Sequence, residues 1–246
     1  MRSTIVSCRS PEGSLRLKPR SWILGMVMAL VYLTATACAN ETPPARNAEP
    51  PASAPVQAQV REGRLVIFLG DSLTAGFGLA ADQAFPALVG EALKNAGVSV
   101  RIVNAGVSGD TTGGALDRLD WLLNQKPDVL VVGLGANDAF RGQPVSSIEA
   151  NLREIVRRAK RAGARVVVLG MRVPTNYGRD YTEAFFDVYA RVAKAEKAEL
   201  MPFLLEGVGG HTELNLDDGI HPNAEGQQII AAGVLPYVRR ALGAPR

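Results

Sequence analysis

Short apolar runs rich in valine and isoleucine alternate with longer segments of helical periodicity, and this alternation constrains the fold more than any other feature. It predicts strands at residues 64–69, 98–104, 129–133, 165–170 and, more weakly, 200–203. It predicts helices at residues 84–96, 113–124, 146–162, 180–198 and 224–242. Strands that are apolar along nearly their whole length are covered on both faces. We therefore expect an α/β protein, a three-layer α/β/α sandwich with a mostly parallel five-stranded sheet.

Local signals mark the ends of some of these helices. The segment from Ser146 to Glu149 has the Ser-x-x-Glu pattern of a capping box, which predicts that the third helix starts there. Gly97 and Gly163 stand where two helices are expected to stop, because glycine readily adopts the left-handed conformation of a helix end.

A leader-like segment precedes the first predicted strand. Arg16, Lys18 and Arg20 come before an uncharged apolar stretch at residues 22–37. This pattern predicts an export signal over residues 1–37. A transmembrane anchor is the alternative, but the stretch of 16 residues is shorter than the ~20 that a spanning helix needs. We therefore expect an exported, periplasmic protein.

Cys38 follows the predicted signal directly. The segment that ends at Cys38 resembles a bacterial lipoprotein processing site, which implies a lipidated cysteine and attachment to a membrane. Ordinary cleavage after Ala37 or Ala39 is the alternative. The only other cysteine is Cys8, so the part of the chain beyond Cys38 has no cysteine for an internal disulfide or a metal site.

Composition separates a linker from a folded domain. Residues 38–62 are rich in proline and alanine and have no apolar periodicity, which is typical of a tether. Residues 63–246 have the composition of one domain. Removing residues 1–37 takes five of 27 basic and one of 24 acidic residues, so 22 basic and 23 acidic residues remain and the net charge is −1. A basic nucleic-acid-binding face is therefore not indicated, and we expect no nucleic-acid partner.

Residues that could act in catalysis follow the predicted strands at their carboxyl ends, where parallel α/β sheets bind ligands. Ser72 follows the first strand and Asn137 follows the third. The chain contains two histidines, His211 and His221, and His221 has Asp218 three residues before it. A serine nucleophile needs an imidazole as its base and a carboxylate to orient that imidazole. Ser72, His221 and Asp218 fit these roles, and His211 is interpreted as a surface residue.

Four segments together resemble the GDSL or SGNH hydrolase superfamily, within it most closely the group of acyl-CoA thioesterases, lysophospholipases and arylesterases. They are Gly70-Asp71-Ser72-Leu73, Gly106, Gly135-Ala136-Asn137-Asp138 and Asp218-Gly219-Ile220-His221. The resemblance implies the flavodoxin-like fold of that superfamily. It implies a catalytic triad of Ser72, Asp218 and His221, with Asp217 as a disfavoured alternative to Asp218.

The same resemblance implies an oxyanion hole and a substrate class. The oxyanion hole would consist of the backbone N–H groups of Ser72 and Gly106 and the side-chain amide of Asn137. Esters and thioesters of fatty acids, lysophospholipids and aryl esters are the expected substrates. No metal or organic cofactor is suggested, and we expect a monomer. The residues expected to line an apolar substrate groove are Val107, Leu134, Phe140, Val173, Pro174 and Tyr177.

Two other functions remain open from the sequence. One is a carbohydrate O-deacetylase of the same superfamily. The other is a non-catalytic lipid- or glycan-binding domain on a lipoprotein tether, although a complete triad with oxyanion donors has no role in binding alone. Hydrolysis of short p-nitrophenyl esters separates an enzyme from a binding protein, and a series of acyl chain lengths separates a lipid esterase from a deacetylase.

Overall fold

Five parallel strands form one sheet in the computed structural model, which describes residues 63–243. The sheet order is β2-β1-β3-β4-β5, and every neighbouring pair is parallel. The strands are β1 (Arg64–Gly70), β2 (Val100–Gly106), β3 (Val129–Gly133), β4 (Arg165–Leu169) and β5 (Glu199–Met201). All five lie within two residues of the segments expected from apolar runs. This order is the flavodoxin-like doubly wound arrangement.

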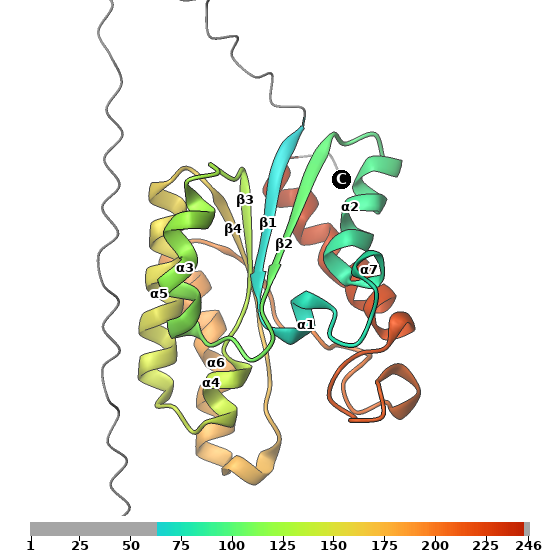
Figure 1. Cartoon of the computed structure of the whole chain (residues 1–246). Coiled ribbons are helices and arrows are strands. Elements are labelled where there is room, and N and C mark those ends of the chain that lie inside the picture. The colour runs from blue at the N-terminus through green and yellow to red at the C-terminus, as the bar shows by residue number, and fades with distance from the viewer. Residues whose placement is uncertain (1–62, 244–246) are drawn as a thin grey trace, which may run out of the picture. The chain divides into compact units, whose positions relative to one another are not determined.

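Five long helices cover the two faces of the sheet. α2 and α7 pack together on one face, whereas α3, α5 and α6 lie on the other (Figure 1). Their bounds are α2 (Phe85–Asn95), α3 (Thr112–Leu123), α5 (Val145–Arg161), α6 (Arg179–Glu196) and α7 (Ala224–Leu242). The predicted three-layer α/β/α sandwich is therefore confirmed.

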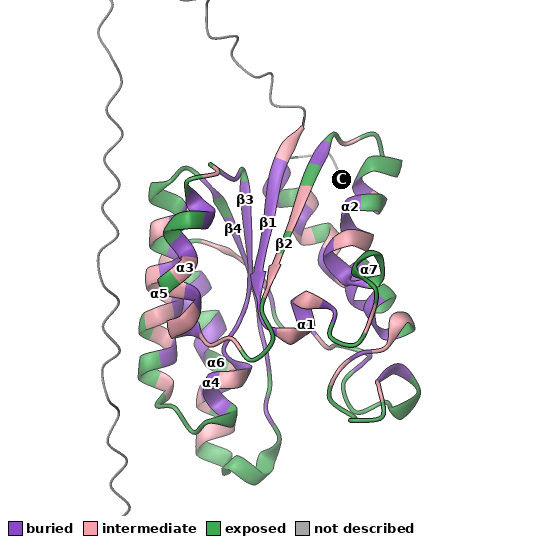
Figure 2. Ribbon diagram, viewed as in Figure 1, coloured by how far each residue is buried: buried purple, intermediate pink, exposed green. Residues whose placement is uncertain are grey.

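Burial explains why the central strands are so apolar. The side chains of β1 after Arg64 and all of β3 are buried, because helices lie against both faces of these strands (Figure 2). β2, at the edge of the sheet, is buried only at Val100, and its other residues are partly or fully exposed. Phe68 of β1 meets the ring of Phe85 of α2 edge to face, with 5.6 Å between ring centroids. The rigid central strands therefore fix the position of whatever follows them.

Short helical turns at the carboxyl end of the sheet were not expected from the sequence. α1 (Ser72–Ala75) follows β1 and α4 (Ala136–Phe140) follows β3. Three 3₁₀ turns lie in loops, at Ala81–Gln83, Thr175–Tyr177 and Thr212–Leu214. Segments of three to five residues are too short to show a helical period, so periodicity cannot predict them.

The predicted capping box is wrong. Helix α5 begins at Val145, with Pro144 as its N-cap and no side-chain cap. The carbonyl oxygen of Pro144 accepts the N–H of Ile148, so the first helical turn already contains Ser146. Proline fixes the backbone at the entry to the helix, and Glu149 instead pairs with Arg153 one turn later.

Within residues 63–243, no helix is long and apolar enough to cross a membrane. The predicted signal at residues 1–37, the lipidation site Cys38 and the linker at residues 38–62 lie outside the described residues.

Candidate active site

Ser72 lies at the start of a one-turn helix that leaves the centre of the sheet. Asp71 caps α1, since one of its side-chain oxygens accepts the N–H of Leu73 at 3.0 Å. Gly76, with φ +75°, ends the turn in the left-handed conformation. A side chain at Gly70 would overlap Thr74, so only glycine lets α1 fold back tightly onto the strand end.

The topology brings the segments after β1 and β3 together. The two strands are neighbours, although β2 lies between them in the sequence. Connections leave the sheet in opposite directions here, which opens the crevice where doubly wound folds bind ligands. Ser72 follows β1 and Asn137 lies in α4 after β3, so both stand at this crevice.

A continuous row of hydrogen-bonding distances joins the three residues proposed as a triad. Nε2 of His221 lies 2.9 Å from Oγ of Ser72, and Nδ1 of His221 lies 2.7 Å from Oδ2 of Asp218. With Nδ1 protonated, His221 donates to Asp218 and leaves Nε2 as the acceptor for the Ser72 hydroxyl. The geometry is that of a nucleophile, its base and the group that orients the base.

Asp218 is held as an anion. Its Oδ1 accepts the backbone N–H groups of Ile220 and His221, both at 2.9 Å. These bonds, together with the one to the His221 side chain, lower the pKa of Asp218 to about 2. Asp217, the alternative carboxylate, makes no hydrogen bond to His221 within the described part of the chain. The arrangement therefore favours Asp218 as the orienting carboxylate.

An aromatic ring covers the imidazole. The rings of Phe77 and His221 lie 4.4 Å apart between centroids with an angle of 34°. Phe77 belongs to the turn after α1, so the segment that carries Ser72 also holds the ring of its base in place. His211, in contrast, is exposed and contacts Glu213 on the surface, as predicted.

Asn137 is positioned by a buried carboxylate. Its Nδ2 donates to Oδ2 of Asp71 at 3.4 Å, a long hydrogen bond. An amide nitrogen carries two hydrogens, so the second remains for a ligand. Asp71 is buried, and this burial raises its pKa to about 6. Asp71, for which the sequence predicted no role, is the N-cap of α1 and also the partner of the Asn137 amide.

Gly106 does not fit the oxyanion role predicted for it. Its N–H already donates to Oδ1 of Asn104 at 3.0 Å, and Nδ2 of Asn104 donates to the carbonyl of Thr74 at 2.8 Å. A side chain at position 106 would overlap the backbone of Ala75. Glycine is therefore needed here because α1 packs directly on the end of β2, and the prediction for Gly106 is contradicted.

Gly109, three residues later, has an N–H with no hydrogen-bond partner among residues 63–243. It occupies a turn closed by the bond from the N–H of Asp110 to the carbonyl of Val107, and its φ is +78°. Arg141, directly after α4, donates to the carbonyl of Gly109 at 2.9 Å. The signal for this turn was present in the sequence as Ser108-Gly109-Asp110, a small residue and a glycine before an aspartate.

An ion pair and hydrogen bonds connect the turn that contains Gly109 to β1, the strand that precedes Ser72. Arg118 of α3 contacts Asp110 at 2.7 Å and also donates to the carbonyls of Gly70 and Ala105. Asp138, the residue after Asn137, accepts both the backbone N–H and the hydroxyl of Thr112. The segments bearing Ser72, Gly109 and Asn137 are thus connected to one another through polar contacts.

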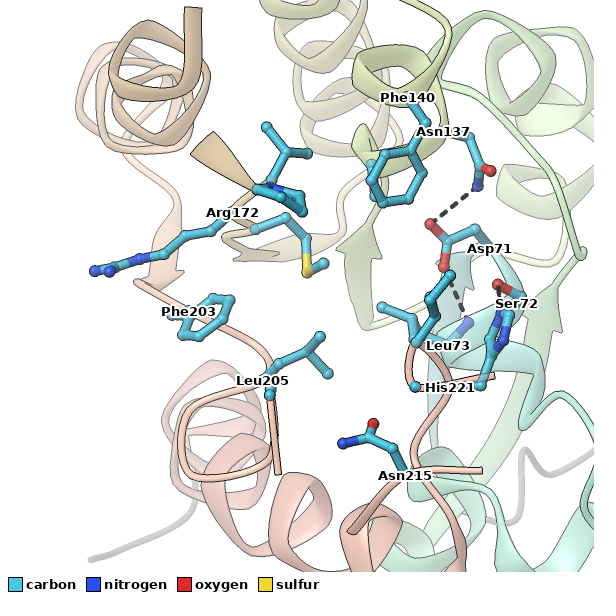
Figure 3. A pocket seen from close by; sticks show the side chains of 18 residues that line it. Asp71, Ser72, Leu73, Asn137, Phe140, Arg172, Phe203, Leu205, Asn215 and His221 are labelled. Atoms are coloured by element: carbon cyan, nitrogen blue, oxygen red, sulfur yellow. Dashed lines mark hydrogen bonds between the residues drawn. The ribbon is translucent and has the colours of Figure 1, made fainter. Parts of the chain in front are cut away.

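A cavity of about 470 Å³ opens beside Ser72, within the range of about 300–1,000 Å³ that is usual for ligand sites. Ser72, Asn137 and His221 lie at one side of it (Figure 3). Apolar side chains from the loops after β3, β4 and β5 form much of the rest of its wall, among them Phe140, Met171, Val173, Pro174, Phe203 and Leu205.

Three of the six residues predicted to contact substrate line this cavity, namely Phe140, Val173 and Pro174. Leu134 does not, because it is fully buried in the core, and its prediction is contradicted. Val107 and Tyr177 are exposed outside the cavity wall. An apolar side chain after a strand is ambiguous in sequence, since both core packing and a ligand pocket favour it.

Known proteins resemble this chain over most of the described residues. The model of the GDSL-like Lipase/Acylhydrolase family matches residues 68–229. An arylesterase of Vibrio mimicus is 43% identical over 167 residues, which are 68% of this chain and 84% of that protein. The thioesterase 1/protease 1/lysophospholipase L1 of Escherichia coli K12 is 41% identical over 167 residues, 68% of this chain and 79% of the relative. The crystal structure of TesA matches with a TM-score of 0.70 at 41% identity, covering 72% of this chain and 99% of that one.

Proposed function

Because the chain belongs to the GDSL-like lipase/acylhydrolase family and is a carboxylic ester hydrolase, we propose that it cleaves fatty acyl esters and thioesters through Ser72, His221 and Asp218. The observation that carries this proposal is the unbroken set of contacts from Ser72 Oγ through His221 to Asp218 at the edge of an apolar cavity. A nucleophile and base in contact, with the base held by a third group, is the arrangement that covalent acyl transfer requires.

In the first half of the reaction, Oγ of Ser72 attacks the acyl carbonyl carbon while its proton passes to Nε2 of His221. The imidazolium that forms is stabilised by Asp218, which stays ionised because its pKa is about 2. The tetrahedral intermediate then collapses, and His221 returns the proton to the departing alcohol or thiol. The acyl group remains as an ester on Ser72.

The second half repeats these steps with water. His221 removes a proton from a water molecule, which attacks the acyl-enzyme carbonyl. Collapse of the second intermediate releases the fatty acid and restores the Ser72 hydroxyl with the proton held by His221. Both halves thus use the same base and the same carbonyl-binding site.

The negative charge on the carbonyl oxygen needs donors that are already in place. We assign this role to the N–H of Ser72, the second Nδ2 hydrogen of Asn137 and the N–H of Gly109 in place of Gly106. The support is that the Gly109 N–H has no partner within residues 63–243, whereas that of Gly106 is engaged by Asn104. In comparable sites each such donor contributes about 2.7–4 kcal/mol to transition-state stabilisation.

The cavity favours acyl chains over acetylated sugars. Phe140, Met171 and Val173 offer an apolar surface next to Ser72, which suits methylene groups. We therefore propose medium or long acyl chains, joined to aryl alcohols, lysophospholipids or thiols. Export to the periplasm and anchoring through Cys38 are part of the same proposal, on the basis of the sequence alone.

Hydrolysis of p-nitrophenyl esters from acetate to palmitate tests the proposal. We expect activity that rises with chain length beyond acetate and is nearly abolished in Ser72→Ala and in His221→Ala. His211→Ala is the matched control, because the exposed side chain of His211 contacts Glu213 on the surface and lies outside the cavity wall. Full activity in His221→Ala would contradict the triad, and a strict preference for acetate would favour a deacetylase.

A further inference from the structure

Arg172 occupies an unusual position beside the cavity. It follows β4 and Met171, and its guanidinium lies over two aromatic rings, 4.2 Å from the centroid of Phe186 and 5.2 Å from that of Phe203. Phe186 belongs to α6, and Phe203 comes after β5. A helix and a loop from separate parts of the chain therefore hold one cationic group in place.

No carboxylate of the described residues pairs with this cation. Within residues 63–243, Arg172 has no ion pair and no hydrogen bond, whereas the nearby Arg179 contacts Glu183 at 2.7 Å. A guanidinium that stacks on aromatic rings keeps its N–H groups directed outward in its own plane. Arg172 thus presents a fixed positive charge with unused donors.

Arg172 also lines the cavity that contains Ser72. Figure 3 shows Arg172 and Phe203 on the side opposite Ser72 and His221, with the guanidinium extended away from Ser72. The apolar residues Leu205 and Val173 line the same cavity. A molecule that reaches from Ser72 to Arg172 therefore crosses this cavity and is best matched by an anion at its far end.

We propose that Arg172 is an anion-binding subsite for substrates that carry a phosphate or carboxylate remote from the scissile ester. This inference rests on the proposed function, because it places the reacting carbonyl at Ser72. A guanidinium binds both phosphate and carboxylate through paired N–H groups. The anion is either a phosphate on the leaving group, as in a lysophospholipid, or a carboxylate at the end of the acyl chain.

Two substrate pairs of equal chain length distinguish these sources. 1-Decanoylglycerol and 1-decanoylglycerol 3-phosphate differ by a phosphate on the leaving group. p-Nitrophenyl decanoate and the mono-p-nitrophenyl ester of sebacic acid differ by a carboxylate at the acyl end. The readout is the ratio of kcat/KM for the anionic substrate to that for its neutral partner, measured below the micelle concentration. Enzyme variants are Arg172→Gln and Arg172→Lys, with Arg179→Gln as the control.

We expect the ratio in one pair to fall by roughly 10- to 100-fold in Arg172→Gln, the range that a charged hydrogen bond supplies. Arg172→Lys should retain part of the preference, and Arg179→Gln should retain all of it. Added salt should lower the preference of the wild-type enzyme, because the subsite is exposed. The pair that responds identifies the source of the anion.

Equal ratios in the wild-type enzyme and Arg172→Gln for both pairs would overturn the inference. So would an equal loss for neutral and anionic substrates, which would show that Arg172 merely covers apolar surface with its aliphatic stem. Failure of the wild-type enzyme to hydrolyse even p-nitrophenyl butyrate would contradict the proposed function instead, so the two failures are separate.

Discussion

Replacing Asp71 with asparagine should make the protein more stable and less active. Asp71 is only 3% exposed, and burial raises its pKa from 3.8 to about 6, although the N–H of Leu73 opposes this. Asparagine has nearly the same shape and keeps an oxygen that accepts from Leu73. The substitution thus removes a buried charge at neutral pH without opening a cavity.

The sign and size of the effect follow from the pKa. The native state holds the Asp71 proton more tightly than the unfolded state, so ionisation lowers the free energy of unfolding as pH rises from about 4 to 6. A change of roughly two pKa units at about 1.4 kcal/mol each gives about 3 kcal/mol. The unfolding free energy of Asp71→Asn minus that of wild type should therefore grow by about 3 kcal/mol as pH rises from about 4 to 7.

Urea denaturation of both proteins at several pH values measures this difference. All other titrating groups are shared, so their contributions cancel when the two unfolding free energies are subtracted. The slopes of the transitions must agree, which shows that both proteins expose the same surface on unfolding. Ester hydrolysis should fall in the variant, because the oxygen of the new amide stays with Leu73 and its NH2 group, which only donates, then faces Nδ2 of Asn137 and cannot accept its hydrogen bond.

A difference in unfolding free energy that stays constant from about pH 4 to pH 7 would refute the reasoning, because it would mean that Asp71 titrates alike in both states. Lower stability of the variant at pH 7 would also refute it. Unchanged kcat would show that the contact between Asp71 and Asn137 has no part in catalysis.

Three further substitutions test the site and the leader. Asn137→Ala should lower kcat by roughly 10²- to 10³-fold with little change in KM, and an effect on KM alone would remove Asn137 from the oxyanion hole. Gly106→Ala should cost about 1–3 kcal/mol of stability, since the added methyl overlaps Ala75, and an unchanged melting temperature would contradict that packing. Cys38→Ser should release the enzyme from membranes or leave an unprocessed precursor, whereas mass spectrometry showing an unmodified mature N-terminus in wild type would exclude lipidation.

The strands and long helices could be predicted because their signals are local. A strand covered on both faces must be apolar throughout, as Val66 to Leu69 are, and helix α7 shows its period over enough turns to be recognised. The start of α5 could not be predicted, because Pro144 and the Ser-x-x-Glu pattern both mark helix starts and only the folded chain decides between them.

The sequence alone predicted the residues proposed for the chemistry of the site but not their full geometry. Ser72, His221 and Asp218 could be proposed because few residues can act as nucleophile and base and because the spacing of the last two permits one loop to hold both. Whether an N–H is free to bind an oxyanion depends on whether another acceptor already binds it. The N–H of Gly106 donates to Asn104, and this contact can be seen only in the folded structure. The same holds for Arg172, whose charge matters because two rings from distant segments hold it and no carboxylate within the described chain reaches it. Periodicity and spacing are local properties, whereas burial and competition for hydrogen bonds arise only when remote segments pack together.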